Sequence, residues 1–234
     1  MDRLTYVRSA YGPFLLNTPG DRTFELCAGG YGRFVADAIE VQARTFMFLD
    51  VGANLGLFSL LAARHPCCER VIAVEPLPTI FRNLQANIRR NAAEKIEPVL
   101  GAVCTTADAF AYLSFDPKHS GMSKMTQAGS GHVRAPVLSA VGLDGLFREF
   151  SDRIVVKIDV EGSEIDVLLT LRRTRFYGAV ADLIIEISER NLGQANRDHL
   201  LRLLAQDGFE EHSRAGPPEH YDALYRKVPL RSAR

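Results

Sequence analysis

Short apolar runs alternate with longer amphipathic stretches along most of this 234-residue chain. The short runs are rich in valine and isoleucine, which suits strands that are buried on both faces of a parallel sheet. Strands that alternate with helices are typical of βαβ units, in which helices cover both faces of the sheet. We therefore predict an α/β fold with a mostly parallel sheet, and its strands are expected at residues 46–51, 71–74, 97–103, 154–158 and 182–187.

The stretches between these runs carry helix signals. Residues 78–90 place Ile80, Leu84 and Ile88 on one face, behind a proline suited to a first helical turn. A glycine at 208 follows the last predicted helix, and a turn at 216–218 then separates two runs that suit a closing hairpin. The remaining predicted elements are helices at 55–65, about 163–171 and 194–206, and hairpin strands at 209–213 and 221–228.

Two regions fall outside this rhythm. Residues 1–44 are interpreted as an N-terminal extension with short strands and a helix near 34–43, and the main domain is expected to cover 45–234. The glycine-rich segment 27–32 lacks the spacing of a phosphate-binding loop. Residues 114–136 are small, polar and lysine-containing, and predict a long mobile loop or hairpin.

Charge and cysteine usage exclude several classes of protein. Basic and acidic residues number 28 each, and this balance argues against a surface dedicated to nucleic acid. The first residues lack the apolar stretch of a signal peptide, and the run 46–63 is interrupted by Asp50 and Asn54, so we expect no membrane span. The four cysteines have no CxxC spacing and are interpreted as reduced thiols of a cytoplasmic protein.

The segment Asp50-Val-Gly-Ala-Asn-Leu-Gly56 follows the first strand of the main domain. A strand that turns at once into a helix places this segment at the carboxyl edge of the sheet, where doubly wound folds bind ligands. We expect Gly52 and Gly56 to let the backbone bend and approach a ligand, and Asn54 to adopt a left-handed conformation. The helix N-terminus then offers N–H groups to a carboxylate. The alternative is an ordinary turn whose glycines serve packing.

Glu75 follows the second strand and indicates an adenosine ligand. An acid in this place can accept both ribose hydroxyls, but it does not report which cofactor carries the adenosine. The dinucleotide fingerprint Gly-x-Gly-x-x-Gly needs a glycine where this chain has Asn54, because a pyrophosphate must come close. S-adenosylmethionine (SAM) has no phosphates, so this residue favours SAM as cofactor. A solvent-exposed acid before Pro76 is the alternative for Glu75.

Acidic residues and one lysine cluster at the end of the fourth strand. Methyl transfer to oxygen needs an aligned acceptor and a group that removes its proton. We expect Lys157, Asp159 and Glu161 to share one strand face, with Asp159 as the base or the orienting group. Glu161 is expected to assist or to contact the methionine amine, Lys157 to tune their charge, and Glu186 to be a further candidate. Alternatively, Glu161 and Glu164 favour a helix N-terminus and Lys157 is their ion-pair partner.

Two further possibilities concern metals and histidines. Asp159, Glu161 and Glu186 are hard oxygen donors that suit Mg²⁺, although their spacing does not demand a metal. His119 lies in the predicted mobile loop and is a candidate second base. The other histidines are interpreted as surface residues, and these are His65, His132, His199, His212 and His220.

The motifs together resemble the FkbM family of SAM-dependent methyltransferases. The resemblance covers about residues 46–190 and rests on 48–59, 74–78, 87–91, 143–144 and the run Lys157-Ile-Asp-Val-Glu-Gly-Ser-Glu164. It implies a seven-stranded class I methyltransferase fold with an antiparallel last strand, and O-methylation of a sugar or another small natural product. Residues 1–44 and 114–136 match loosely and are expected to select the acceptor. The cofactor residues it implies are Asp50, Gly52, Asn54, Gly56, Glu75, Pro76 and Ala102, and we add Asp159.

Three other functions compete with this interpretation. A nicotinamide-dependent oxidoreductase is supported by Glu75 and opposed by Asn54. A scaffold protein that kept the fold would have no need of Asp159 and Glu161 together. An RNA acceptor is disfavoured by the zero net charge.

Overall fold

The computed structural model describes residues 4–126 and 133–228. Within these residues the central sheet has seven strands, and β13 alone runs antiparallel to its neighbours. This confirms the predicted fold class. In spatial order the strands are β12 (Phe209–Ala215), β13 (His220–Lys227), β11 (Val180–Ser188), β10 (Ile154–Ile158), β3 (Phe46–Val51), β4 (Cys68–Glu75) and β5 (Ile96–Leu100).

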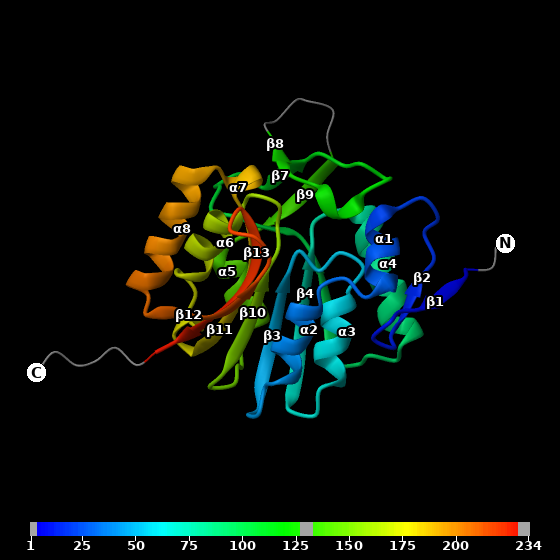
Figure 1. The fold of residues 1–234 in the computed structure, drawn as a ribbon, viewed down its shortest axis with the longest axis horizontal. Coiled ribbons are helices and arrows are strands. Elements are labelled where there is room, and N and C mark those ends of the chain that lie inside the picture. The colour runs from blue at the N-terminus through cyan, green and yellow to red at the C-terminus, as the bar shows by residue number, and fades with distance from the viewer. Residues whose placement is uncertain (1–3, 127–132, 229–234) are drawn as a thin grey trace, which may run out of the picture.

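Helices cover both faces of this sheet (Figure 1). Strand side chains alternate between two hydrophobic clusters, as the two-residue period of a buried strand requires. Phe48 and Val155 belong to one cluster, and Leu49 and Val156 belong to the other. The first face carries α1 (Arg22–Gly29), α2 (Arg33–Glu40), α3 (Leu57–Arg64) and α4 (Pro78–Arg90), and the second carries α5 (Ala140–Leu146), α6 (Glu164–Leu171) and α8 (Gln194–Gln206).

The third predicted strand, 97–103, is divided in the structure. β5 ends at Leu100, and β6 (Ala102–Val103) pairs with β9 (Val133–Leu138) instead of β4. Gly101 stands at the break, where a Cβ atom would lie 3.2 Å from that of Leu138. β6 and β9 form a small sheet with β7 (Phe110–Leu113) and β8 (Met125–Thr126), which lies above the upper edge of the central sheet in Figure 1.

The segment predicted as a long mobile loop, 114–136, is therefore largely folded where it is described. It contains the short 3-10 helix Ser120–Met122, β8 and the start of β9, and residues 127–132 lie outside the described part. The paired strands of the described residues correspond to a hairpin, which was one of the two forms predicted, and the mobility of the segment stays a prediction. Small polar residues suggested a loop, but the strands pair with β7, which is not visible in local composition.

All five predicted helices are observed, and those expected at 55–65 and about 163–171 are α3 and α6. The predicted ranges 78–90 and 194–206 are those observed, whereas the helix near 34–43 covers Arg33–Glu40. Three α-helices were missed, α1, α5 and the short α7 (Glu189–Leu192), although Asp21 and Ser139 cap the N-termini of the first two as such residues commonly do. Helix α7 follows β11 directly.

All four cysteines are free thiols. Among the described residues, no helix combines the length and apolar character needed to cross a membrane.

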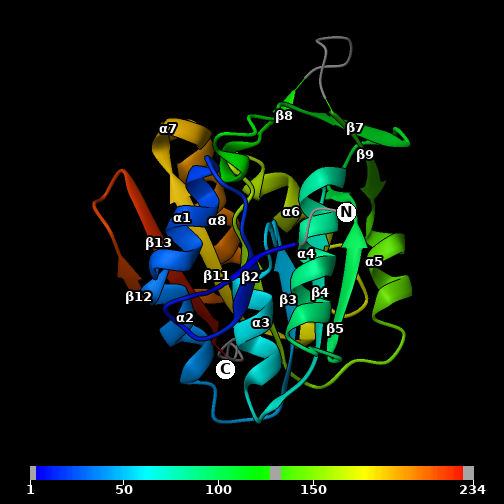
Figure 2. The ribbon, with the colours of Figure 1, turned by 90° about the vertical axis from the view of Figure 1, so that its right-hand side faces the viewer.

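Two asparagines of α4 hold the N-terminal strand β2 (Phe14–Leu16), which pairs with β1 (Tyr6–Arg8) (Figure 2). The Asn87 side chain is fully buried, accepts a hydrogen bond from Leu16 N at 2.6 Å and donates one to Leu55 O at 2.8 Å. Asn91, one turn later, accepts from Phe14 N at 2.8 Å. These amides satisfy backbone groups that would otherwise be buried without partners.

We predict that Asn87→Ala lowers the free energy of unfolding by about 2 to 4 kcal/mol, because a buried N–H and a buried C=O lose their partner. Urea denaturation measures this change. Asn83→Ala removes the same amide one turn earlier on α4 and is expected to change stability by no more than about 0.5 kcal/mol. Equal losses in the two variants would contradict the bridging role of Asn87.

Candidate functional site

A cavity of about 270 Å³ opens at the carboxyl ends of β3, β4 and β10. The floor of the cavity lies where the sheet face that packs against α1 to α4 ends in polar side chains. Asp50, Glu75 and Lys157 alternate with residues of the second face, so the two-residue strand period brings them to the same side. The site residues predicted from sequence that line the cavity are Gly52, Asn54, Glu75, Pro76, Ala102, Lys157, Asp159, Glu161 and Glu186.

The turn after β3 has the backbone expected from its sequence. Gly52, Asn54 and Gly56 all adopt positive φ angles, of 81°, 50° and 82°. Packing against the protein is a second reason for the glycines, beside the predicted bend of the backbone. A Cβ atom on Gly52 would lie 1.9 Å from the Asp159 carbonyl oxygen, and one on Gly56 would lie 2.3 Å from a methyl carbon of Leu84. Both glycines therefore make room for the protein itself, and Gly56 is not part of the cavity wall.

Glu75 joins the β4 tip to the turn after β3. One carboxylate oxygen accepts a hydrogen bond from Asn54 N at 2.9 Å, and the other accepts one from Leu77 N at 2.8 Å. Its side chain is buried yet lines the cavity, so it is not the exposed acid of the alternative interpretation. Burial raises the pKa of Glu75 to about 7. Each oxygen retains a lone pair for a further donor.

Asp50 and Lys157 lie beneath the cavity. They are neighbours in the parallel register of β3 and β10, and Lys157 Nζ is 3.1 Å from Asp50 Oδ1 and 3.5 Å from Asp159 Oδ2. The same ammonium group donates to Gly52 O at 3.0 Å. Burial acts to lower the pKa of Lys157, but the carboxylates of Asp50 and Asp159 raise it overall. Lys157 is therefore a permanent cation.

Direct contact between Asp50 and a cofactor, as the family resemblance implied, does not agree with this placement. The Asp50 side chain is fully buried and is not part of the cavity wall, and its second oxygen accepts from Ser59 Oγ at 2.6 Å. Its ion pair with Lys157 instead fixes the strand ends on which the turn is built. Lys157 pairs with Asp50 and Asp159, and not with Glu161 and Glu164 as the alternative proposed.

Three carboxylates meet at the other end of the cavity. One oxygen from each of Asp159, Glu161 and Glu186 lies within 4.8 Å of the others. The strand β10 ends at Ile158, so Asp159 and Glu161 lie in the following loop and do not share a strand face as predicted. Glu161 has a positive φ of 55°, and its side chain accepts a hydrogen bond from Asn191 at 2.6 Å.

At this acidic end, burial and repulsion between neighbouring carboxylates raise the pKa values of three acids. Burial, with a further contribution from Asp159, raises the pKa of Glu161 to about 7, that of Glu186 to about 9 and that of Asp222 to about 6. The cluster therefore favours bound positive charge. The three carboxylates satisfy the distance requirement of a cation site, and Mg²⁺ stays a prediction. Glu164 is directed elsewhere, since it is buried and accepts from Gly162 N at 2.9 Å.

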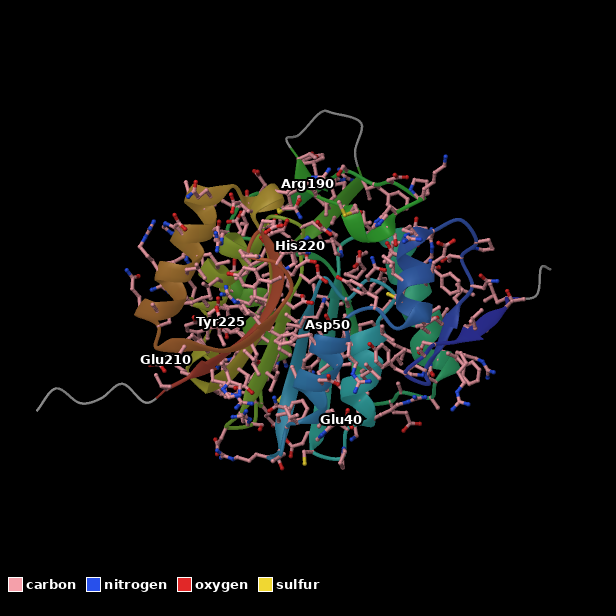
Figure 3. The ribbon with its side chains drawn as sticks, viewed as in Figure 1. Glu40, Asp50, Arg190, Glu210, His220 and Tyr225 are labelled. Atoms are coloured by element: carbon pink, nitrogen blue, oxygen red, sulfur yellow. The ribbon has the colours of Figure 1, made fainter. Side chains whose placement is uncertain are left out.

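Two residues that sequence reasoning did not select face the same carboxylates. Tyr31, in the loop between α1 and α2, donates to Glu186 Oε1 at 3.5 Å. His220 Nε2, at the start of β13, lies 3.0 Å from the same oxygen. His220 is exposed, as predicted for a surface residue, but it also lines the cavity. Figure 3 shows His220 above Asp50, at the opposite end of the sheet from Glu40.

A cover over the cavity is formed by described residues of 1–44 and 114–136, the two regions outside the alternation of strands and helices. Asp21, the N-cap of α1, accepts hydrogen bonds from the backbone and the hydroxyl of Ser120 at 3.1 and 2.8 Å. Gly121 N donates to Thr23 Oγ1 at 2.8 Å. Asn54 Nδ2 reaches Ser120 Oγ at 3.5 Å, so the cover also contacts the turn below it. His119, the predicted second base, lies in this cover and lines the cavity.

Comparison with known proteins gives one family match. The family described as "Methyltransferase FkbM domain" matches residues 50–211. The AMB antimetabolite synthetase AmbE of Pseudomonas aeruginosa is 30% identical over 201 residues, which cover 69% of this chain and 9% of AmbE. The chain therefore spans less than a tenth of the length of this curated relative.

Two solved structures with a TM-score of 0.50 share the fold. TrmK of M. capricolum, in complex with S-adenosyl-homocysteine, is 10% identical, and the match covers 83% of this chain and 67% of TrmK. Trm5b of Pyrococcus abyssi is 15% identical, and the match covers 95% of this chain and 54% of Trm5b.

We predict that Lys157→Met lowers the free energy of unfolding by about 3 to 5 kcal/mol, because it leaves the Asp50 carboxylate buried without its cation. Adding Asp50→Asn removes the stranded charge, so the double variant should regain about 1 to 3 kcal/mol. Denaturant titration of both variants provides the comparison, and the exposed Lys118→Met is the matched control. Losses that simply add in the double variant would rule out the coupling.

Glu75 predicts a stability that depends on pH. Its folded pKa is raised from 4.5 to about 7, so its contribution is fully present below about pH 4.5 and is lost as the pH rises through about 7. Relative to Glu75→Gln, the wild type should therefore lose about 3 kcal/mol across this window. Parallel unfolding curves at several pH values measure the difference. Glu94→Gln, at an exposed position, should follow the wild type, and a Glu75→Gln curve that does so as well would contradict the prediction.

Proposed function

This chain belongs to the FkbM family of methyltransferase domains, and on that premise we propose that it transfers a methyl group from SAM to a hydroxyl group of a small acceptor. The observation that carries the proposal is the single cavity wall formed by the turn after β3, by Glu75 and by the carboxylates after β10. One end of this wall suits an adenosine, and the other suits a cationic centre beside an acceptor.

The residues of the first end fit the cofactor. Glu75 has lone pairs left for the two ribose hydroxyls, and Pro76 and Ala102 supply apolar wall for an adenine. The N-terminus of α3 follows the turn and suits the methionine carboxylate. The TrmK structure, which shares the fold, contains S-adenosyl-homocysteine, and we infer the same cofactor product here.

The acidic end suits the transfer itself. SAM supplies an electrophilic methyl group on a positively charged sulfur. The carboxylates of Asp159, Glu161 and Glu186 favour positive charge beside them, and burial strengthens that interaction. Asp159 is held by Lys157 and is placed to orient an acceptor hydroxyl. Tyr31, Thr23 and His119, which come from residues 1–44 and 114–136, complete the wall and select the acceptor.

A small natural product is the acceptor class that we propose. The curated relative AmbE is an antimetabolite synthetase, and the balanced charge of this chain does not favour a nucleic acid. Residues of α1 and the short helix Ser120–Met122 also line the cavity, and such a wall suits a small acceptor.

The cofactor is tested by isothermal titration calorimetry. We expect saturable binding of S-adenosyl-homocysteine and no binding of NADH. Glu75→Gln should weaken the affinity by about 10- to 100-fold, because it replaces charged hydrogen bonds to ribose by neutral ones. Preferential binding of NADH would support an oxidoreductase instead.

The transfer is tested with methyl-labelled SAM and a panel of sugars, hydroxy acids and phenols, each paired with its amine analogue. We expect label in an ether-linked methyl group, and Asp159→Asn should lower turnover. Label found only in the amine analogues would disprove the hydroxyl preference.

A further inference from the structure

His119 and His220 both line the cavity, and His220 contacts the acidic cluster through Glu186. His220 begins β13, which lies beside β11, and the sheet register places His220 opposite Ser188 and Asp222 opposite Glu186. Side chains two residues apart on a strand share a face, so His220 and Glu186 are diagonal neighbours within reach of each other. The 3.0 Å contact between His220 Nε2 and Glu186 Oε1 follows from this register.

Glu186 fixes the orientation of the imidazole ring. A contact of this length between a carboxyl oxygen and a ring nitrogen holds one proton between them. Burial raises the pKa of Glu186, but hydrogen bonds donated by Tyr31 and by Nε2 of His220 favour its ionised form. With the proton on Nε2, the other ring nitrogen, Nδ1, is unprotonated in neutral histidine and can accept a proton. Tyr31 donates to the same Glu186 oxygen.

The neighbouring acids are already engaged. Asp159 pairs with Lys157, and Glu161 accepts from Asn191. His220 differs from both because its side chain is 57% exposed, whereas that of Glu186 is 7% exposed. A base must release its proton to water in each catalytic cycle, and His220 combines contact with the cavity and contact with solvent. Imidazole is also the side chain whose ordinary pKa lies nearest neutral pH.

We infer that His220 is the general base of the methyl transfer and that Glu186 is its positioning residue. The acceptor O–H bond breaks, and its proton passes to Nδ1 of His220. The electron pair of the oxygen forms the new bond to the methyl carbon, and the pair of the broken carbon–sulfur bond stays on sulfur. The proton then leaves from the exposed ring to water.

The surrounding charges stabilise the imidazolium ion that forms. Carboxylates and a phenol face this region from several elements. The ammonium group of Lys157 is held beneath them by Asp50 and Asp159, and that of Lys124 donates to Asn191 beside Glu161. Such groups counterbalance the positive charge that the ring gains when it takes the proton of the acceptor. The groups of this region are Glu186 of β11, Asp222 of β13, Asp159 and Glu161 of the β10–α6 loop, and Tyr31 of the α1–α2 loop.

The first test needs no acceptor and rests on the proposed function only through the bound ligand. Nitrogen NMR of histidine-labelled protein with sinefungin, a cationic SAM analogue, reports which ring nitrogen carries the proton, and His220→Gln identifies the signal. We expect neutral His220 to be protonated at Nε2, with a changed tautomer ratio in Glu186→Gln. A proton on Nδ1 would overturn the inference, because Glu186 would then have kept its own proton.

The second test uses the acceptor from the panel above that gives the highest turnover. His220→Gln should lower kcat by about 100-fold or more with little change in KM, and added imidazole should restore part of the kcat of His220→Ala. Glu186→Gln should also lower kcat more than it changes KM. His212→Gln, at an exposed histidine of the same hairpin, should keep the wild-type kcat, and an unchanged kcat in His220→Gln would refute the assignment.

Two controls separate the possible failures. If the wild type binds neither S-adenosyl-homocysteine nor sinefungin, the proposed function fails, whereas binding with an Nδ1 proton fails the base assignment alone. Wild-type turnover that requires a divalent cation and disappears with EDTA would also overturn the inference, because Glu186 and His220 would then act as metal ligands. Turnover that survives EDTA supports it.

Discussion

The ammonium group of Lys157 lies between the carboxylates of Asp50 and Asp159 at the point where β3 and β10 end. This buried pair joins two strands that are distant in sequence, and it holds the Gly52 carbonyl from below. The turn that follows β3 can then pack against the backbone of Asp159 with no room for a side chain. The cofactor end and the acidic end of the cavity thus depend on the same two ion pairs of Lys157, so a shift of one end affects the other.

The sequence predicted those features that depend on local periodicity. Buried parallel strands appear as continuous apolar runs, and the amphipathic helix 78–90 was found with its correct ends because a proline begins it and its apolar face is regular. The left-handed turn was predicted for a similar reason, since glycine and asparagine are the residues that accept that backbone. The predicted contact sites Gly52, Asn54 and Glu75 lie on the cavity wall.

Features that depend on distant partners were not predictable. The neighbouring sequence does not predict the contact of Gly56 with Leu84 or that of His220 with Glu186. These contacts arise from packing and from strand order. Asp50 shows the same limit, because its role was predicted from local sequence alone. Its position in a binding motif suggested a ligand contact. The parallel register instead places it beside Lys157, where it supports the site from beneath the cavity. Helix α1 was missed because its glycine-rich end resembles a loop.

The shared use of Asp21 has a consequence for how the cavity opens. The same carboxylate caps α1 through Thr23 N and holds Ser120, so when Ser120 moves away Asp21 loses two of its three hydrogen bonds and keeps only the one from the helix. We therefore expect movement of Ser120 and fraying of the first turn of α1 to be coupled through Asp21, although the two segments are about a hundred residues apart. An acceptor that holds Ser120 against Asp21 would thus be detected as slower amide hydrogen exchange at Thr23.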